Sequence, residues 1–170
     1  MNEWLCIDPG IHGGIAWTED GTVKAAKMPE GMTEQADFIR SIAVKNPNVK
    51  AILERTGTYK SGNSGVGAVT FARHCGNIEM CLYMLSIPTE QVAAAVWQKG
   101  IGTWSKDKQE RKKQIKEWAA RKYPHLKVTL DISDAVAILG WVTRKENLPS
   151  AAPKKGVKKI GKQTLLRKTK

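Results

Sequence analysis

The sequence predicts a single α/β domain, and three observations support this class. Short apolar runs typical of strands alternate with longer segments of helical periodicity. The expected order begins with three strands and continues with helix, strand, helix, strand and then helices only, as in a hairpin unit followed by crossover units. The chain has 170 residues, of which 41% are hydrophobic, so it can form one substantial core. We therefore expect a central mixed five-stranded sheet, whose first three strands are antiparallel, with helices on both faces.

The strands follow from compact apolar runs and the turns between them. The expected strands span residues 3–8, 14–18, 22–28, 49–54 and 86–92. A glycine-rich turn joins the first two. Asp20-Gly21 separates the second from the third, and this dipeptide between apolar runs is a strong hairpin signal. The sequence therefore predicts a hairpin of the second and third strands.

The helices are predicted from spacing, caps and stops. They span residues 33–44, 68–85, 93–99, 105–123 and 131–143. Thr33 and Ser105 are the expected N-caps of the first and fourth helices. Asn46-Pro47-Asn48 and Pro124 are expected to stop those same helices. The last helix is amphipathic, with an apolar stripe that docks it on the sheet.

Two acids lie at the ends of predicted strands. Asp8 ends the first apolar run and is followed by Pro9-Gly10, with no cationic residue beside it, whereas Glu54 ends the run VKAILE. An unpaired charge at the end of a buried strand is costly, so either a cation from elsewhere meets Asp8 or the strand assignment is wrong. If the two strands are neighbours, both carboxylates reach the same place.

A second pair of acids lies in the segment LDISDAVAILGW. Asp131 and Asp134 are three residues apart at the start of the last predicted helix, so they face the same side with Cβ atoms roughly 5–6 Å apart. Converging acids repel one another unless divalent cations bind them. We therefore expect Asp8, Glu54, Asp131 and Asp134 to hold Mg²⁺. Two such ions about 3.5–4 Å apart can clamp the attacking and leaving oxygens of a phosphodiester.

Each acid taken alone also has a structural explanation. Asp131 fits the N-cap of its helix, and Asp134 fits an acid in the first turn that favours the helix dipole. Glu54 can pair with Arg55 at the surface, and Asp8 before Pro-Gly can form a turn. The joint arrangement favours a site, because three separate elements each deliver an acid where a buried element ends.

Most of the net charge of +12 lies near the C-terminus. The stretch from Arg144 to Lys170 has ten Lys and Arg residues against one Glu, and it shows prolines, glycines and little periodicity. We expect a folded domain of residues 1–145 and a flexible basic tail of residues 146–170. Such a tail attracts a polyanion through phosphate contacts, or it only keeps the protein soluble.

The remaining composition bears on location. No run approaches the ~20 apolar residues of a membrane span, and the chain opens with an expected core strand, so we expect neither a membrane partner nor a signal peptide. The three cysteines form an odd set in apolar contexts, which favours small core residues in a reducing compartment. We therefore expect a cytoplasmic protein.

Four segments carry a resemblance that covers roughly residues 3–143: IDPGIHGGIA, ILERTGTYKSGNSGVGAVTFARHCG, VWQKGIG and DISDAVAIL. Together they resemble the RuvC-like Holliday-junction resolvases, in particular the small forms of phages and mobile elements. The resemblance implies a ribonuclease H-like fold and a homodimer, located in a bacterial or phage-infected cell. It also implies cutting of four-way DNA junctions by paired symmetric nicks, with Mg²⁺ or Mn²⁺ as the metal and 5′-phosphate and 3′-hydroxyl ends as products.

The same resemblance implies roles for single residues. The family's catalytic, metal-binding acids correspond to Asp8, Glu54, Asp131 and Asp134, with two ions per active site. An aromatic loop that follows the second acid in the family corresponds to the stretch around Tyr59 and Lys60. An aromatic residue there stacks on bases or wedges between them at the crossover, although Tyr59 also fits a plain surface tyrosine.

Basic residues complete the implied DNA contacts. The family's basic helix before the last acids resembles DKQERKKQIKEW, where Lys108 and Lys112 have the i, i+4 spacing to contact the scissile phosphate. A solvated helix face explains these charges equally well. Arg73 and His74 would line the DNA surface, although His74 also fits a partly buried histidine.

The apolar helix of residues 67–85 is the expected dimer interface.

Three other functions fit parts of the pattern. The D-x-G start followed by Gly-Gly also opens actin-like ATPases, but those proteins need a second similar domain, and this chain shows no second motif of that kind. A binding protein could hold branched DNA without cutting it. A nuclease of the same fold could act on RNA–DNA hybrids or flaps, since fold alone does not fix the substrate.

Overall fold

A computed structural model describes residues 3–55 and 65–147 and contains a five-stranded mixed sheet. The strands are β1 (Trp4–Asp8), β2 (Gly14–Glu19), β3 (Thr22–Lys27), β4 (Lys50–Arg55) and β5 (Thr89–Ala93). Their order is β3-β2-β1-β4-β5, with antiparallel pairing among β1, β2 and β3 and parallel pairing of β4 with β1 and β5. The predicted class and the antiparallel arrangement of the first three strands are confirmed.

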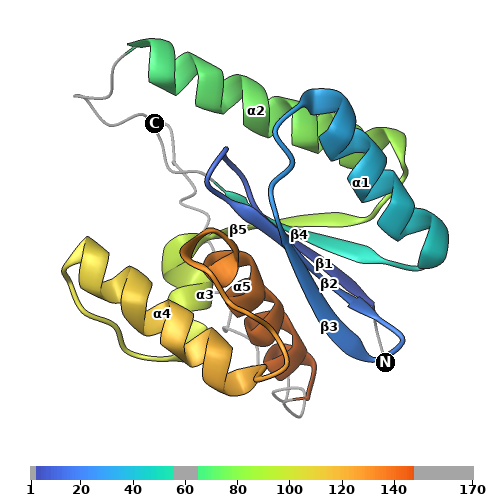
Figure 1. The fold of residues 1–170 in the computed structure, drawn as a ribbon. Coiled ribbons are helices and arrows are strands. Elements are labelled where there is room, and N and C mark those ends of the chain that lie inside the picture. Colours follow the sequence, from blue (N-terminus) through green and yellow to red (C-terminus); the bar gives the residue numbers. More distant parts are fainter. Residues whose placement is uncertain (1–2, 56–64, 148–170) are drawn as a thin grey trace, which may run out of the picture.

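Helices cover both faces of this sheet (Figure 1). They are α1 (Met32–Lys45), α2 (Gly65–Met84), α3 (Ala94–Ile101), α4 (Lys108–Lys122) and α5 (Leu130–Asn147). Buried residues form two clusters, one beneath α1 and α2 and the other beneath α3, α4 and α5. The sheet separates these two cores, as the predicted three-layer arrangement requires.

The alternation of side chains along β1 and β4 decides which acid faces which layer. Cys6 and Ile52 belong to the core shared with α5, whereas Ile7 belongs to the core beneath α1 and α2. Because successive side chains of a strand point to opposite faces, Asp8 and Glu54 lie on the same face as Cys6 and Ile52. Both acids therefore lie at the end of a strand on the α5 side.

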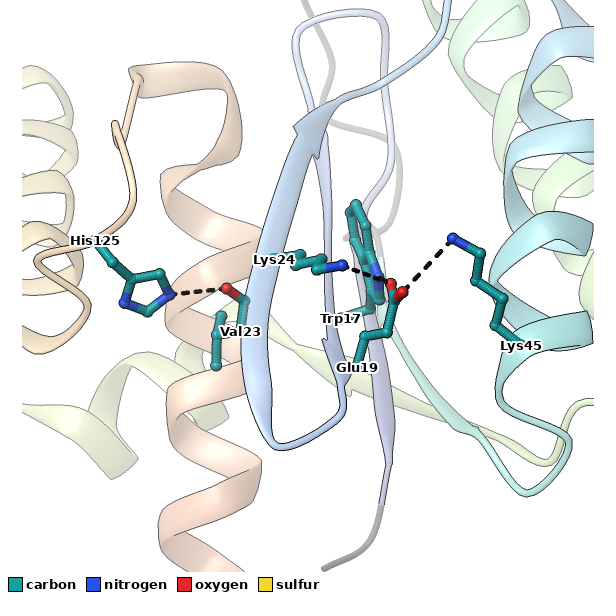
Figure 2. A network of polar contacts seen from close by, with 6 residues as sticks. All are labelled: Trp17, Glu19, Val23, Lys24, Lys45 and His125. Atoms are coloured by element: carbon teal, nitrogen blue, oxygen red, sulfur yellow. Dashed lines mark hydrogen bonds and ion pairs between the residues drawn. The ribbon is translucent and has the colours of Figure 1, made fainter.

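The predicted hairpin of β2 and β3 is confirmed. Asp20 and Gly21 both have positive φ, 52° and 73°, as a tight two-residue turn between twisted strands requires. Figure 2 shows that the carboxylate of Glu19, just before the turn, lies between Lys24 of β3 and Lys45 of α1, at 3.1 and 3.5 Å. These contacts join the hairpin to the end of α1.

The connection from α4 to α5 contacts the backbone of the edge strand β3 through His125. His125 Nε2 lies 2.9 Å from the carbonyl oxygen of Val23, as Figure 2 also shows. Exposed edge strands offer unpaired backbone groups to other chains, so this contact protects one of those groups. It also ties the segment that precedes α5 to the sheet.

Several predicted boundaries were wrong, each for a local reason. The N-cap of α1 is Gly31 rather than Thr33, which lies inside the helix. Asp107 caps α4 in place of Ser105, and its side chain accepts a 2.8 Å bond from the backbone of Glu110. Ser86 has a positive φ of 54° in the turn after α2, so the last strand begins only at Thr89.

Parts of the sequence prediction lie outside the described residues. These include Tyr59 and Lys60 and nearly all of the expected basic tail, because the last described residue is Asn147, where α5 ends. The proposed boundary at residue 145 and the flexibility of the tail remain predictions. Within residues 3–55 and 65–147, no helix combines the length and the apolar character needed to cross a membrane.

Candidate active site

Three of the four predicted acids line one cavity. Asp8 from the end of β1, Glu54 from β4 and Asp134 from α5 border a space of about 450 Å³. The other lining residues are Pro9, Gly10, Ile11, His12, Gly13, Phe71, Gln98, Lys108, Arg111, Lys112 and Ile115. The cavity therefore joins acids from three separate elements with basic side chains from α4.

The fold brings these acids together through two features. Strands β1 and β4 are parallel neighbours, so Asp8 and Glu54 arrive at the same edge of the sheet. Helix α5 then rests directly on β2 at Gly14, where an added Cβ would stand 2.8 Å from Cα of Ile132. Only glycine permits this approach, which places Asp134, two residues after Ile132 in α5, beside the strand ends.

Burial and mutual repulsion make the three carboxylates hard to ionise. Burial raises the pKa of Asp8 well above its ordinary value, and the charges of Glu54 and Asp134 raise it further. Burial also raises the pKa of Glu54 to about 7, against a hydrogen bond from Trp97 that lowers it. Asp134 shifts in the same direction, again mainly through burial, while Lys112 and Arg111 oppose the shift. Burial and mutual repulsion therefore favour the protonated forms of these acids, and the charges of Lys112 and Arg111 offset this only in part.

The donor set fits a hard divalent cation in two respects. It consists of carboxylate oxygens, which Mg²⁺ prefers, and Asp134 Oδ1 is buried without a hydrogen-bond partner among the described residues. Against this, no three His, Cys, Asp or Glu side chains of residues 3–55 and 65–147 are already arranged to hold a metal ion. The carboxylates would have to draw closer together to ligate one.

Asp131 lies apart from the other acids. It does not line the cavity, and its Oδ2 is 3.8 Å from Nζ of Lys27 on β3. The i, i+3 spacing thus places Asp131 and Asp134 near each other but against different neighbours. The predicted joint arrangement of four acids is present for three of them.

The basic side of the cavity comes from the first turns of α4. Lys108 and Lys112 both line it, at the predicted i, i+4 spacing. Arg111 lies between them and is held by bonds of 3.1 Å from its Nη1 to the carbonyl oxygens of Ser105 and Lys106. The sequence prediction named the two lysines but not this arginine.

Trp97, Gln98 and Phe71 also belong to the site and were not predicted. The indole Nε1 of Trp97 donates a 2.9 Å hydrogen bond to Glu54, and Gln98 follows it on α3. Phe71 lies on α2 and borders the cavity. The segments VWQKGIG and AVTFARHCG contain these residues, but nothing in their spacing indicates which strand end they approach.

Arg73 and His74 do not line this cavity. They border a neighbouring pocket between α2 and the loop that follows β1. The Nε2 atom of His74 is buried there with no hydrogen-bond partner among the described residues, and burial lowers the pKa of its ring. The DNA contact predicted for Arg73 and His74 would therefore lie on a surface next to the carboxylate cavity, and not inside it.

Comparison with known proteins places this geometry within a known fold. No family model and no curated protein matches the chain. Two solved structures of RuvC from Thermus thermophilus do match in structure, one in complex with a Holliday junction substrate and one without it. Their TM-scores are 0.55 and 0.53 at 15% sequence identity, and each match covers 85% of this chain and 96% of RuvC. The chain therefore has the RuvC-like, ribonuclease H-like fold that its sequence predicts.

Proposed function

We propose that this protein is a metal-dependent endonuclease that resolves four-way DNA junctions. The observation that carries the proposal is the cavity in which Asp8, Glu54 and Asp134, from three elements, face the basic side chains of α4. Carboxylates for a divalent cation beside cations for a phosphate form a combination suited to phosphodiester hydrolysis. The fold supports the junction as substrate, since a RuvC of the same fold is described with a Holliday junction.

The acids have the primary role in this proposal. Asp8, Glu54 and Asp134 would hold Mg²⁺, or Mn²⁺ in its place. Asp131 would become a further metal ligand once its ion pair with Lys27 breaks. When bound, the ions would supply Lewis-acid activation of water and stabilisation of the leaving oxygen. Trp97 fixes the orientation of Glu54 and favours its ionised form. The expected products are nicks with 5′-phosphate and 3′-hydroxyl ends.

The basic residues act on the DNA. Lys112 lies close enough to the acids to lower the pKa of Asp8, so its positive charge acts at the part of the cavity that contains the carboxylates. We assign it to the scissile phosphate and to the negative charge that grows there during cleavage. Lys108 and Arg111 line the same cavity and would hold the phosphate backbone. Without a cation, the ionised carboxylates would repel that phosphate.

A homodimer would present two such cavities to the two strands cut in a junction. Apart from Phe71, which lines the carboxylate cavity, helix α2 carries several exposed apolar residues along its length: Val66, Val69, Met80, Tyr83 and Met84. With Arg40 and Asn77, Met80 and Met84 also line an apolar groove of about 440 Å³ between α1 and α2. We propose this surface as the contact with a second copy. A monomeric mass in light scattering at working concentration would contradict it.

The test is a cleavage assay on labelled DNA. A four-way junction, a Y-fork and a linear duplex of matched sequence are incubated with the protein in Mg²⁺ or in EDTA. We expect paired nicks in the junction that require metal and are lost in Asp134→Asn. The matched control is Asp37→Asn, because Asp37 is an exposed acid on α1 that pairs with Arg40 outside the cavity.

Other results would select a different function. Equal cutting of the fork and the junction would indicate a broader nuclease for branched DNA. Cutting of an RNA–DNA hybrid in preference to the junction would indicate a hybrid nuclease of the same fold. Tight junction binding without cutting in any metal would leave a junction-binding protein and reject the enzyme.

A further inference from the structure

Lys27 is a cation near the candidate active site to which the proposed function assigns no role. It is the last residue of β3, and its Nζ lies 3.8 Å from Oδ2 of Asp131. The Lys27 side chain is 55% exposed and that of Asp131 is 34% exposed. Neither residue lines the cavity of Asp8, Glu54 and Asp134. The ion pair therefore lies outside the cavity, within one helical turn of Asp134.

The sheet fixes the backbone on the Lys27 side of this pair. Lys27 pairs with Gly14 of β2. At the next residue, the N–H of Met28 donates a 3.1 Å bond to the carbonyl oxygen of Gly13. Val23 packs in the core beneath α5, and alternate side chains of a strand point to the same face. The fold itself thus directs the Lys27 side chain towards the layer of α5.

The contact between α5 and β2 fixes the backbone on the Asp131 side. An added Cβ on Gly14 would stand 2.9 Å from the carbonyl oxygen of Asp131, so the first turn of α5 lies directly on the strand. Gly14 is also the residue opposite Lys27 in the sheet. Because both backbones are held at the same point of the sheet, rotation of the two partly exposed side chains is enough to form or break the ion pair.

The charge of Lys27 competes with that of a metal ion at Asp131. The i, i+3 spacing places Asp131 near Asp134, which borders the cavity. Like charges a few ångströms apart repel, so the Lys27 ammonium and a divalent cation at Asp131 would destabilise each other. An ion pair between exposed side chains is weak, so a divalent cation can displace Lys27.

We infer that Lys27 is a positioning residue that holds Asp131 in place of a metal ion. Lys27 neutralises this acid while the site lacks metal, and it must release the acid before Asp131 can become a ligand. The inference rests on the proposed function, in which Asp131 is a further metal ligand. Lys27 therefore lowers the affinity of the free protein for the ion that Asp131 would hold.

The test measures metal binding in the absence of DNA. Mn²⁺ is titrated into the protein at low ionic strength, where exposed charges are least screened, and free Mn²⁺ is quantified by electron paramagnetic resonance. Lys27→Ala should bind its second Mn²⁺ ion about two- to fivefold more tightly than the wild type, the range for loss of an exposed ion pair. Lys27→Arg, which keeps the charge, should resemble the wild type.

The matched control is Lys24→Ala. Lys24 is exposed on the same strand but pairs with Glu19 at 3.1 Å, as Figure 2 shows. Its position, three residues before Lys27, places its side chain on the opposite face of the sheet. The variant loses the same charge, and its Mn²⁺ affinity should equal that of the wild type. Urea denaturation in EDTA verifies that each variant is folded.

A double-mutant cycle tests whether Lys27 acts through Asp131. In the Asp131→Asn protein, Lys27→Ala should leave the Mn²⁺ affinity unchanged, because the carboxylate for which the two cations compete is gone. An increase of equal size in both backgrounds would show that Lys27 acts through its general charge, and it would overturn the inference.

Two further results separate an error in the inference from an error in the proposed function. If Lys27→Ala binds Mn²⁺ like the wild type while Asp8→Asn binds it much more weakly, the metal site is present and Lys27 has no part in it. The inference then fails and the proposed function stands. If neither Asp8→Asn nor Asp134→Asn weakens Mn²⁺ binding, the cavity is not a metal site, and the proposed function fails together with the inference.

Discussion

Trp97 Nε1 donates a hydrogen bond of 2.9 Å to Oε2 of Glu54, and this contact links the core beneath α5 to the carboxylate cavity. Trp97 is fully buried, so its position is fixed by packing. The bond favours the ionised form of Glu54, yet burial still raises the pKa of that carboxyl to about 7. The carboxyl of Glu54 is therefore only partly ionised near pH 7, and small changes in its surroundings alter its ionised fraction.

Trp97→Phe should move the acid limb of the cutting rate to higher pH by about one pH unit. The substitution removes a hydrogen bond to a charged group, which is worth about 1.5–3 kcal/mol, so the pKa of Glu54 rises further. Cutting rates measured between pH 6 and 9 test this. Trp4→Phe is the control, because it also loses an indole bond, to Glu146, at the opposite end of β1. A similar displacement in both variants would contradict a specific effect on Glu54.

The metal-free protein should lose stability as the pH rises through neutrality. Glu54 has a pKa of about 7 when folded and about 4.5 when unfolded, so between these values the folded state holds a proton that the unfolded state has lost. The contribution of Glu54 to the free energy of unfolding is therefore largest below pH 4.5, and it falls by about 3 kcal/mol by pH 8. The raised pKa values of Asp8 and Asp134 act in the same direction.

Urea denaturation in EDTA at pH 5 to 8 measures this trend. Glu54→Gln should make the decline with pH shallower, because only Asp8 and Asp134 then contribute to it, and the variant should be more stable than the wild type at pH 8, although it would no longer cut DNA. Mg²⁺ should raise the stability of the wild type at pH 8 and have less effect on the variant. Wild-type stability that stays constant over this range would show that folding does not raise the pKa values of these carboxyls.

The sequence was sufficient to predict the sheet and to name the three acids that line the cavity, Asp8, Glu54 and Asp134. Whether the strands of Asp8 and Glu54 are neighbours was left open, and the parallel pairing of β1 with β4 shows that they are. The different surroundings of Asp131 and Asp134 depend on how α5 sits on Gly14, a tertiary contact that spacing does not encode. Phe71 and Trp97 were missed for the same reason.

Lys112→Ala should reduce the cutting rate by about a hundredfold while changing junction affinity little. Lys112 lines the cavity and lowers the pKa values of Asp8, Glu54 and Asp134, so its loss affects both the phosphate and the acids. Lys113→Ala removes the same charge from the next position of α4, which is exposed and outside the cavity. That control should reduce the salt dependence of binding by about one phosphate contact at most. Equal losses of cutting in both variants would assign Lys112 to general attraction of DNA.

Gly14→Ala should destabilise the fold and reduce cutting together. The added Cβ would stand 2.8 Å from Cα of Ile132 and 2.9 Å from the carbonyl oxygen of Asp131, and backbone atoms cannot move aside singly. Helix α5 must therefore shift off the sheet, at a cost of about 1–3 kcal/mol, and it takes Asp134 with it. Gly76→Ala is the control, since an added Cβ meets nothing within 4 Å there and alanine favours a helix. Urea denaturation at pH 5, where the acids repel least, separates the packing cost from electrostatics. Unchanged stability and cutting in Gly14→Ala would mean that the contact between α5 and β2 does not position the site.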